Sequence, residues 1–85
     1  MNRTEIEEGV REVLAARAKI PIDVRHVDGS QSLYDVGMTS HATVKVMLGL
    51  EDHFEIEFPD EMLQRSIFDQ IFRIVSAVEK LLLAS

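Results

Sequence analysis

Cysteine is absent from this chain of 85 residues. Without thiol groups the chain can form neither disulfides nor a thiolate metal site, and any thiol chemistry must be borrowed. Long apolar runs are also missing: no stretch approaches the length of a membrane span, and residues 1–5 contain no apolar signal region. These absences predict a cytoplasmic protein that does not enter a membrane.

Basic residues are few, nine against fifteen acidic residues, which gives a net charge of −6. The acidic excess lies in residues 26–64, which contain eight acidic residues and one basic residue. This composition argues against nucleic-acid binding, because nucleic acids require a basic surface. It favours partner proteins with positively charged docking surfaces, although acids that only keep a small domain in solution would give the same composition.

Apolar residues recur with helical periodicity and predict an all-α fold. Thr4-Glu5-Ile6-Glu7 has the form of a capping box, with Thr4 as the N-cap of a first helix that ends before Pro21. Further helices are expected from Thr39 or Ser40 to Phe54, from Asp60 to about Arg65, and from Phe68 or Asp69 to Leu82. The residues expected to face the core are Ile6, Val10, Val13 and Leu14, then Thr43, Val46, Met47, Leu50 and Phe54, then Met62 and Leu63, and finally Ile71, Ile74, Val75, Val78 and Leu82.

The length allows one domain, residues 1–85, which we expect to be a monomer. We expect a small four-helix bundle of three longer helices and one short helix, with a long loop of residues 19–38 between the first two helices. Because this loop contains many apolar residues, we expect packing across the bundle to order it.

A serine stands where the second helix begins. Residues 34–49 read Tyr-Asp-Val-Gly-Met-Thr-Ser-His-Ala-Thr-Val-Lys-Val-Met-Leu-Gly, so a loop ends at Gly37, Thr39 can cap the helix and Ser40 is left free. This segment resembles the acyl carrier protein family, in which Asp-Leu-Gly-x-Asp-Ser-Leu introduces the serine that carries 4′-phosphopantetheine.

The resemblance extends from Leu33 to Asp60, where Glu55-Ile56-Glu57-Phe58-Pro59-Asp60 is similar to the Ile-x-Ile-Pro-Asp run of the family. It implies that Ser40 is the attachment site for 4′-phosphopantetheine, which a phosphopantetheinyl transferase takes from coenzyme A. The phosphate would lie at the positive end of the helix dipole. The alternative is that Ser40 serves only as an N-cap.

Two residues beside the serine depart from the family pattern. Thr39 replaces the usual aspartate, and His41 replaces the usual leucine. Thr39 can still cap the helix, but a transferase that reads the aspartate would find no negative charge here.

The resemblance implies a substrate carrier and not an enzyme. The chain would hold an acyl or aminoacyl group as a thioester, and no Gly-x-Ser-x-Gly elbow surrounds Ser40 to make it a nucleophile. Met38-Thr39-Ser40-His41 and residues 57–68 look closer to aminoacyl carrier proteins, which receive amino acids from ligases similar to truncated seryl-tRNA synthetases. The implied partners are a loading ligase, such as an amino acid:carrier protein ligase, and a downstream acyl-transfer enzyme. Fatty-acid, polyketide and nonribosomal-peptide carriage are the alternatives.

The outer face of the second helix mixes charged residues with two apolar residues, Val44 and Leu48, one turn apart. An apolar pair beside the serine, rimmed by charged residues, predicts a docking surface. The residues predicted to bind partners are His41, Val44, Lys45, Leu48, Glu51 and Asp52. A rival interpretation is an unmodified helical adaptor that binds its partner through the same surface.

No metal site is expected, because His41 and His53 lie twelve residues apart on one helix and His26 is expected at the surface of the loop. Four apolar side chains, Met47, Met62, Phe68 and Phe72, are expected mainly in the core. A pocket for the cargo, lined by the same side chains, is the alternative.

Overall fold

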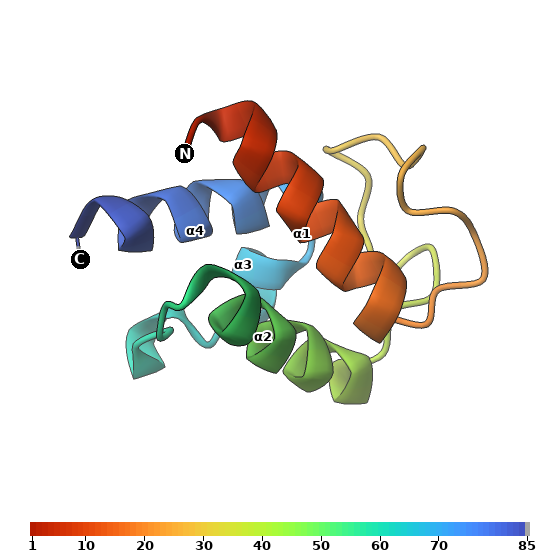
Figure 1. The fold of residues 1–85 in the computed structure, drawn as a ribbon. Coiled ribbons are helices and arrows are strands. Elements are labelled where there is room, and N and C mark those ends of the chain that lie inside the picture. The colour runs from red at the N-terminus through yellow and green to blue at the C-terminus, as the bar shows by residue number, and fades with distance from the viewer. Residues whose placement is uncertain (85) are drawn as a thin grey trace.

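The fold consists of α-helices joined by loops and one short 3₁₀ turn (Figure 1). The structure is a computed structural model that describes residues 1–84. Its elements are α1 (Arg3–Arg17), α2 (Ser40–Phe54), the 3₁₀ turn η1 (Asp60–Met62), α3 (Arg65–Phe68) and α4 (Ile71–Ala84). Three long helices and one short helix in residues 1–84 confirm the predicted all-α bundle, and no strand is present in that range.

Helix α1 begins two residues earlier than predicted, because Asn2 and not Thr4 is its N-cap. The Asn2 side chain accepts a hydrogen bond from the Glu5 amide at 2.9 Å, and the Glu5 carboxylate accepts one from the Asn2 amide at 3.0 Å. The capping box therefore uses Asn2 and Glu5, where the sequence suggested Thr4 and Glu7. The earlier start adds two residues to the helix, including Arg3, which pairs with Glu79 of α4 at 3.2 Å.

Helix α1 packs against both α2 and α4, and two glycines set its distance from α2. A Cβ atom on Gly9 would lie 2.6 Å from the Phe54 ring, and one on Gly49 would lie 2.9 Å from the Val13 side chain. Both distances are too short for real contacts, so the close approach of these helices requires glycine at the two positions. Of the predicted core residues of α1, Ile6, Val10, Val13 and Leu14 are all buried.

The buried face of α2 is turned slightly from the predicted one. Ala42 and Gly49 are buried, whereas Thr43 and Met47 are half-buried. Gly49 faces α1, which comes too close there for a larger side chain, and Thr43 and Met47 line a pocket described below. Of the remaining predicted core residues of α2 and α4, Leu82 is half-buried. The others are buried: Val46, Leu50, Phe54, Ile71, Ile74, Val75 and Val78.

The predicted helix from Asp60 to Arg65 is wrong. The chain forms a 3₁₀ turn that ends at Met62, and Gln64 then adopts an extended conformation (φ −126°, ψ 145°) before α3 begins. Leu63 is 46% exposed and does not pack into the core as predicted. The Gln64 side chain donates a hydrogen bond to the Glu61 carbonyl at 2.8 Å. In a longer helix this carbonyl would instead accept a hydrogen bond from a backbone amide.

The long loop between α1 and α2 is ordered by packing, as predicted. Its apolar residues Val24, Val27, Leu33 and Met38 are buried. The guanidinium of Arg11 donates to the carbonyls of Val24 (2.8 Å) and Val27 (2.7 Å), which ties the loop to α1. Figure 1 shows the loop covering one end of the bundle.

Backbone hydrogen bonds join the same loop to the start of α4. The amide of Leu33 donates to the Asp69 carbonyl at 2.7 Å, and the amide of Phe72 donates to the Gly29 carbonyl at 3.0 Å. The Phe72 ring covers Gly29 and remains 45% exposed, whereas Phe68 is buried against Phe58. The loop therefore holds the segment before α2 in a fixed place.

Two carboxylates close turns within the loop. The amide of Arg25 donates to Asp23 at 3.0 Å, and the hydroxyl and amide of Ser30 donate to Asp28 at 2.6 and 2.8 Å. These hydrogen bonds favour the ionised carboxylates, so the Arg25 amide lowers the pKa of Asp23 and the Ser30 hydroxyl lowers the pKa of Asp28.

Candidate functional site

A tight turn places Ser40 at the start of α2. Gly37 has a positive φ of 117°, which side chains other than glycine rarely adopt, and its amide donates to the Tyr34 carbonyl at 3.2 Å. The next residue, Met38, is buried and anchors the turn in the core. The chain therefore enters α2 from a fixed point, one residue before Thr39.

Thr39 is the N-cap of α2, as predicted, so the Ser40 hydroxyl is not needed to cap the helix. The Thr39 hydroxyl accepts a hydrogen bond from the Ala42 amide at 3.0 Å. Ser40 is the first helical residue, its side chain is exposed, and its hydroxyl makes no hydrogen bond with any residue from 1 to 84. A reagent or enzyme can therefore reach the Ser40 hydroxyl without breaking an internal contact.

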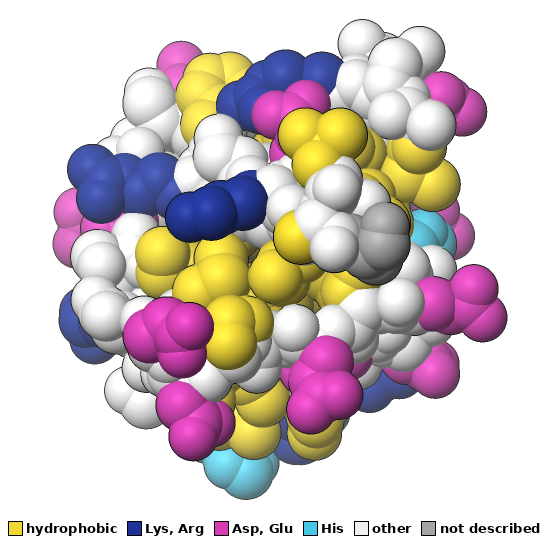
Figure 2. Space-filling view, turned by 90° about the vertical axis from the view of Figure 1, so that its left-hand side faces the viewer, with side chains coloured by type: hydrophobic (Ala, Val, Ile, Leu, Met, Phe, Trp, Pro, Cys, Tyr) yellow, Lys and Arg dark blue, Asp and Glu magenta, His cyan; other side chains and the backbone are white. Residues whose placement is uncertain are grey.

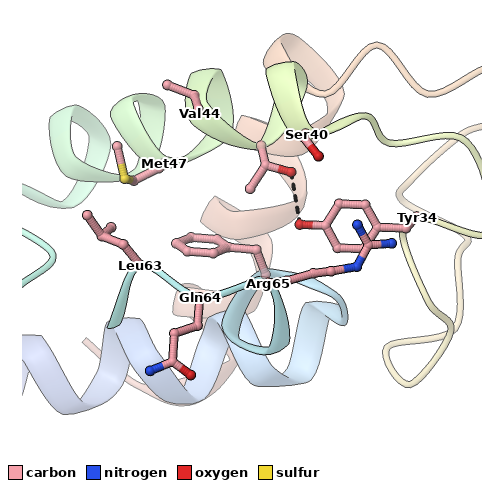
Figure 3. Close-up of a pocket in the computed structure, with 9 residues that line it drawn as sticks. Tyr34, Ser40, Val44, Met47, Leu63, Gln64 and Arg65 are labelled. Atoms are coloured by element: carbon pink, nitrogen blue, oxygen red, sulfur yellow. Dashed lines mark hydrogen bonds between the residues drawn. The ribbon is translucent and has the colours of Figure 1, made fainter. Parts of the chain in front are cut away.

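A pocket of about 300 Å³ opens beside Ser40, between α2 and the segment that carries Leu63 and α3 (Figure 3). Met47 and Leu63 lie at its apolar end, and Tyr34, Ser40 and Arg65 lie at its polar end. Thr43, Val44, Gln64 and Phe68 complete the lining. Of the four side chains that the sequence suggested for a cargo pocket, Met47 and Phe68 line this cavity. Met62 and Phe72 instead line a separate groove on α4.

Hydrogen bonds and a stacked arginine order the polar end of this pocket. The Thr43 hydroxyl donates to the Thr39 carbonyl at 3.0 Å, so the Tyr34 hydroxyl, 3.0 Å from the Thr43 oxygen, must be the donor between those two groups. The guanidinium carbon of Arg65 lies 3.7 Å from the centroid of the Tyr34 ring. Sequence reasoning missed Tyr34 and Arg65, because one lies in an irregular loop and the other at the end of a helix predicted in the wrong place.

The residues predicted to bind partners lie mostly together on the outer face of α2. Val44 and Leu48 are each 52% exposed, and His41, Lys45 and Asp52 are exposed beside them. All five side chains are exposed, and their contact with a partner stays a prediction.

Glu51 differs from its neighbours on α2. It is half-buried, and its carboxylate accepts a hydrogen bond from the Phe58 amide at 2.8 Å. This bond connects α2 to the segment that follows it. Glu51 therefore already has a structural partner, which leaves Asp52 as the freer acid at this end of the helix.

No group of three or more His, Asp or Glu side chains within residues 1–84 is arranged to hold a metal ion. His53 packs edge-on against the Phe54 ring, with centroids 4.7 Å apart, and His26 lies at the surface beside Asp23. Across residues 1–84, no helix has the length and apolar character needed to cross a membrane.

Comparison with known proteins identifies the family. Residues 8–67 match the family model described as "Phosphopantetheine attachment site". The chain belongs to this family of carrier proteins. The cofactor of such carriers is 4′-phosphopantetheine, on which they hold acyl or aminoacyl groups.

Similar proteins include aminoacyl carriers. The chain is 40% identical over 73 residues to the aminoacyl carrier protein of Agrobacterium fabrum, covering 86% of this chain and 88% of that protein. It is 29% identical over 80 residues to an acyl carrier protein of Akkermansia muciniphila, covering 94% and 96% of the two chains.

A solved structure supports the same relationship. The carrier protein from Agrobacterium tumefaciens, in a crystal structure with an engineered Bradyrhizobium japonicum glycine:[carrier protein] ligase and AMP, superposes with a TM-score of 0.83. The two sequences are 38% identical, and the match covers 86% of this chain and 97% of the other. This carrier protein therefore shares its fold with a relative that was crystallised with a glycine:[carrier protein] ligase.

Proposed function

We propose that Ser40 carries 4′-phosphopantetheine and that the chain presents an aminoacyl group, held as a thioester, to partner enzymes. One observation at the start of α2 carries this proposal. Thr39 caps the helix, and the Ser40 side chain remains exposed without an internal hydrogen bond. A structural N-cap would use its own hydroxyl for the helix, and here Thr39 has that task.

The local chemistry fits the cofactor. The amides of Ser40 and His41 precede the first intrahelical hydrogen bond of α2, which the Thr43 amide makes, so they are free to stabilise a negative phosphate. When bound, the cofactor supplies the thiol that this chain lacks, and that thiol holds the cargo. The chain itself offers an exposed hydroxyl to a modifying enzyme.

The proposed protein is a carrier and not an enzyme. Ser40 and His41 make no hydrogen bond with each other, and both side chains are exposed, so the serine has no positioned base within residues 1–84. Modification would come from a phosphopantetheinyl transferase that uses coenzyme A. A downstream acyl-transfer enzyme would take the cargo. The cytoplasmic location, the monomeric state and the single domain of residues 1–85 belong to the same proposal.

We propose aminoacyl cargo in preference to fatty-acyl cargo. The similar proteins named above include an aminoacyl carrier protein and a carrier protein crystallised with a glycine:[carrier protein] ligase. The test is to incubate the modified protein with ATP, that ligase and a panel of amino acids. We expect one aminoacyl group per chain, released by hydroxylamine as a thioester would be. Loading by fatty-acid ligases alone would replace this proposal with fatty-acyl carriage.

The docking surface formed by His41, Val44, Lys45, Leu48 and Asp52 supports a second prediction. Leu48→Glu places a charge in the middle of the exposed apolar pair, so it should lower kcat/KM of the loading reaction by about 5- to 30-fold, or about 1–2 kcal/mol. The matched control is Leu83→Glu, which changes an 82% exposed leucine on α4 and should leave loading unchanged. Equal kinetics for the Leu48→Glu variant and the wild type would rule out docking through this surface.

The same exposed pair, Val44 and Leu48, favours a second candidate, an adaptor that binds partners without being modified. The two candidates differ in a single respect, the state of Ser40. If a competent transferase leaves the mass of the wild-type chain unchanged while Leu48→Glu still disrupts a partner complex, the adaptor interpretation is favoured.

A further inference from the structure

Among the basic residues within residues 1–84, Arg65 alone stacks on an aromatic ring. Like Arg17 and Arg25, it has no carboxylate partner there. Three other arginines pair with carboxylates: Arg3 with Glu79, Arg11 with Glu7 and Arg73 with Asp69. The Arg65 side chain forms no ion pair and donates no hydrogen bond within residues 1–84, although acids outnumber bases by fifteen to nine. Its guanidinium N–H groups are therefore free to bind an anion.

Stacking gives this unpaired guanidinium a defined place. Its carbon atom lies 3.7 Å from the centroid of the Tyr34 ring, a cation–π contact. The ring is fixed in turn, because the Tyr34 hydroxyl donates to Thr43 at 3.0 Å and Thr43 donates to the carbonyl of Thr39, also at 3.0 Å. Arg65 is thus connected through two side chains to the first turn of α2.

The same turn carries Ser40, and Ser40 and Arg65 line one pocket of about 300 Å³. Figure 3 shows Ser40, Tyr34 and Arg65 gathered at one end of this pocket, with Met47 and Leu63 at the other. An anion attached to the serine would therefore have an ordered cation at the same end of the cavity.

We propose that Arg65 binds the phosphodiester that joins 4′-phosphopantetheine to Ser40. This inference rests on the proposed function, since it requires a phosphate at Ser40. Guanidinium suits the task, because its planar donors match two phosphate oxygens at once, which an ammonium group cannot do. Arg65 is a positioning residue: it holds the first part of the arm against the pocket of this chain and takes no part in thioester chemistry.

Phosphorus NMR of the modified protein tests the proposal without any loading enzyme. Because Arg65 is exposed, its contact with the phosphodiester should weaken with salt. We expect the phosphorus resonance of the wild type to move between about 0.01 M and about 1 M NaCl, a range over which the Debye length falls from about 30 Å to about 3 Å. In Arg65→Gln the resonance should start at the high-salt position and stay there.

Two controls separate a specific contact from the general charge of the chain. Arg73→Gln removes an exposed arginine that already pairs with Asp69, and its spectra should follow the wild type. Arg65→Lys keeps the charge but loses the planar donors, so it should retain only part of the salt-dependent shift. The side-chain N–H resonance of Arg65 should also shift when the unmodified chain is converted to the modified one.

The outcomes distinguish this inference from the proposed function. An unchanged intact mass after transferase treatment overturns the attachment at Ser40, and with it both proposals. Modification at Ser40 with identical phosphorus resonances in the wild type and Arg65→Gln at every salt concentration overturns the role of Arg65 alone. Proton–nitrogen correlation spectra of each variant check that the fold is retained.

Discussion

Ser40→Ala should abolish the addition of phosphopantetheine to this chain. The substitution removes the one hydroxyl that the turn at Gly37 and the cap at Thr39 leave exposed at the start of α2. The measurement is the intact mass of the protein after incubation with coenzyme A and a phosphopantetheinyl transferase. The wild type should gain the mass of one phosphopantetheine, and the variant should gain nothing.

This loss should not come from unfolding. Thr39 supplies the capping hydrogen bond, so the Ser40→Ala change should alter the free energy of unfolding by less than about 0.5 kcal/mol, as is usual for exposed positions. Ser66→Ala is the matched control, since Ser66 is an exposed serine on α3 and the modification should proceed normally without it. Addition of the group to the Ser40→Ala chain would show that another residue is the acceptor.

Leu50→Ala should destabilise the fold by about 2–5 kcal/mol, because it removes a completely buried side chain and leaves a cavity between helices. Leu48→Ala offers the matched comparison two residues earlier on the same helix. Leu48 is 52% exposed, so its truncation should cost no more than about 0.5 kcal/mol.

Urea denaturation monitored by circular dichroism measures both changes as differences in the free energy of unfolding. A loss of several kcal/mol is a large part of the total stability of a small domain, about 5–15 kcal/mol. Similar losses for the two variants would contradict the assignment of Leu48 to the docking surface and Leu50 to the core.

The sequence predicted the long helices well because their apolar residues repeat with helical spacing. The sequence misplaced the start of α1, because two residues near the N-terminus both have the pattern of a capping box. Asn2 and Thr4 each stand three residues before a glutamate, and only the packed structure, in which Arg3 reaches Glu79, distinguishes them. It failed again at Leu63, where spacing suggested a helix but the chain turns to bring Arg65 beside Tyr34.

The candidate site was predictable in part for a similar reason. Ser40 and its cap Thr39 are neighbours in the sequence, so a local motif reveals them. The contact of Tyr34 with Arg65 joins a residue of the long loop to the first residue of α3, far apart in the sequence. The bond from the Phe58 amide to Glu51 depends on how the chain leaves α2. Such contacts follow from tertiary packing, which no local pattern encodes.

The most direct test of the central claim is the mass of the wild-type chain isolated from the cells that make it naturally. Peptide mapping by mass spectrometry should find one phosphopantetheine per chain, on the peptide that contains Ser40. A chain that never carries the group in those cells, or carries it on a different residue, would contradict the claim that the exposed hydroxyl at the start of α2 is the working site of this carrier.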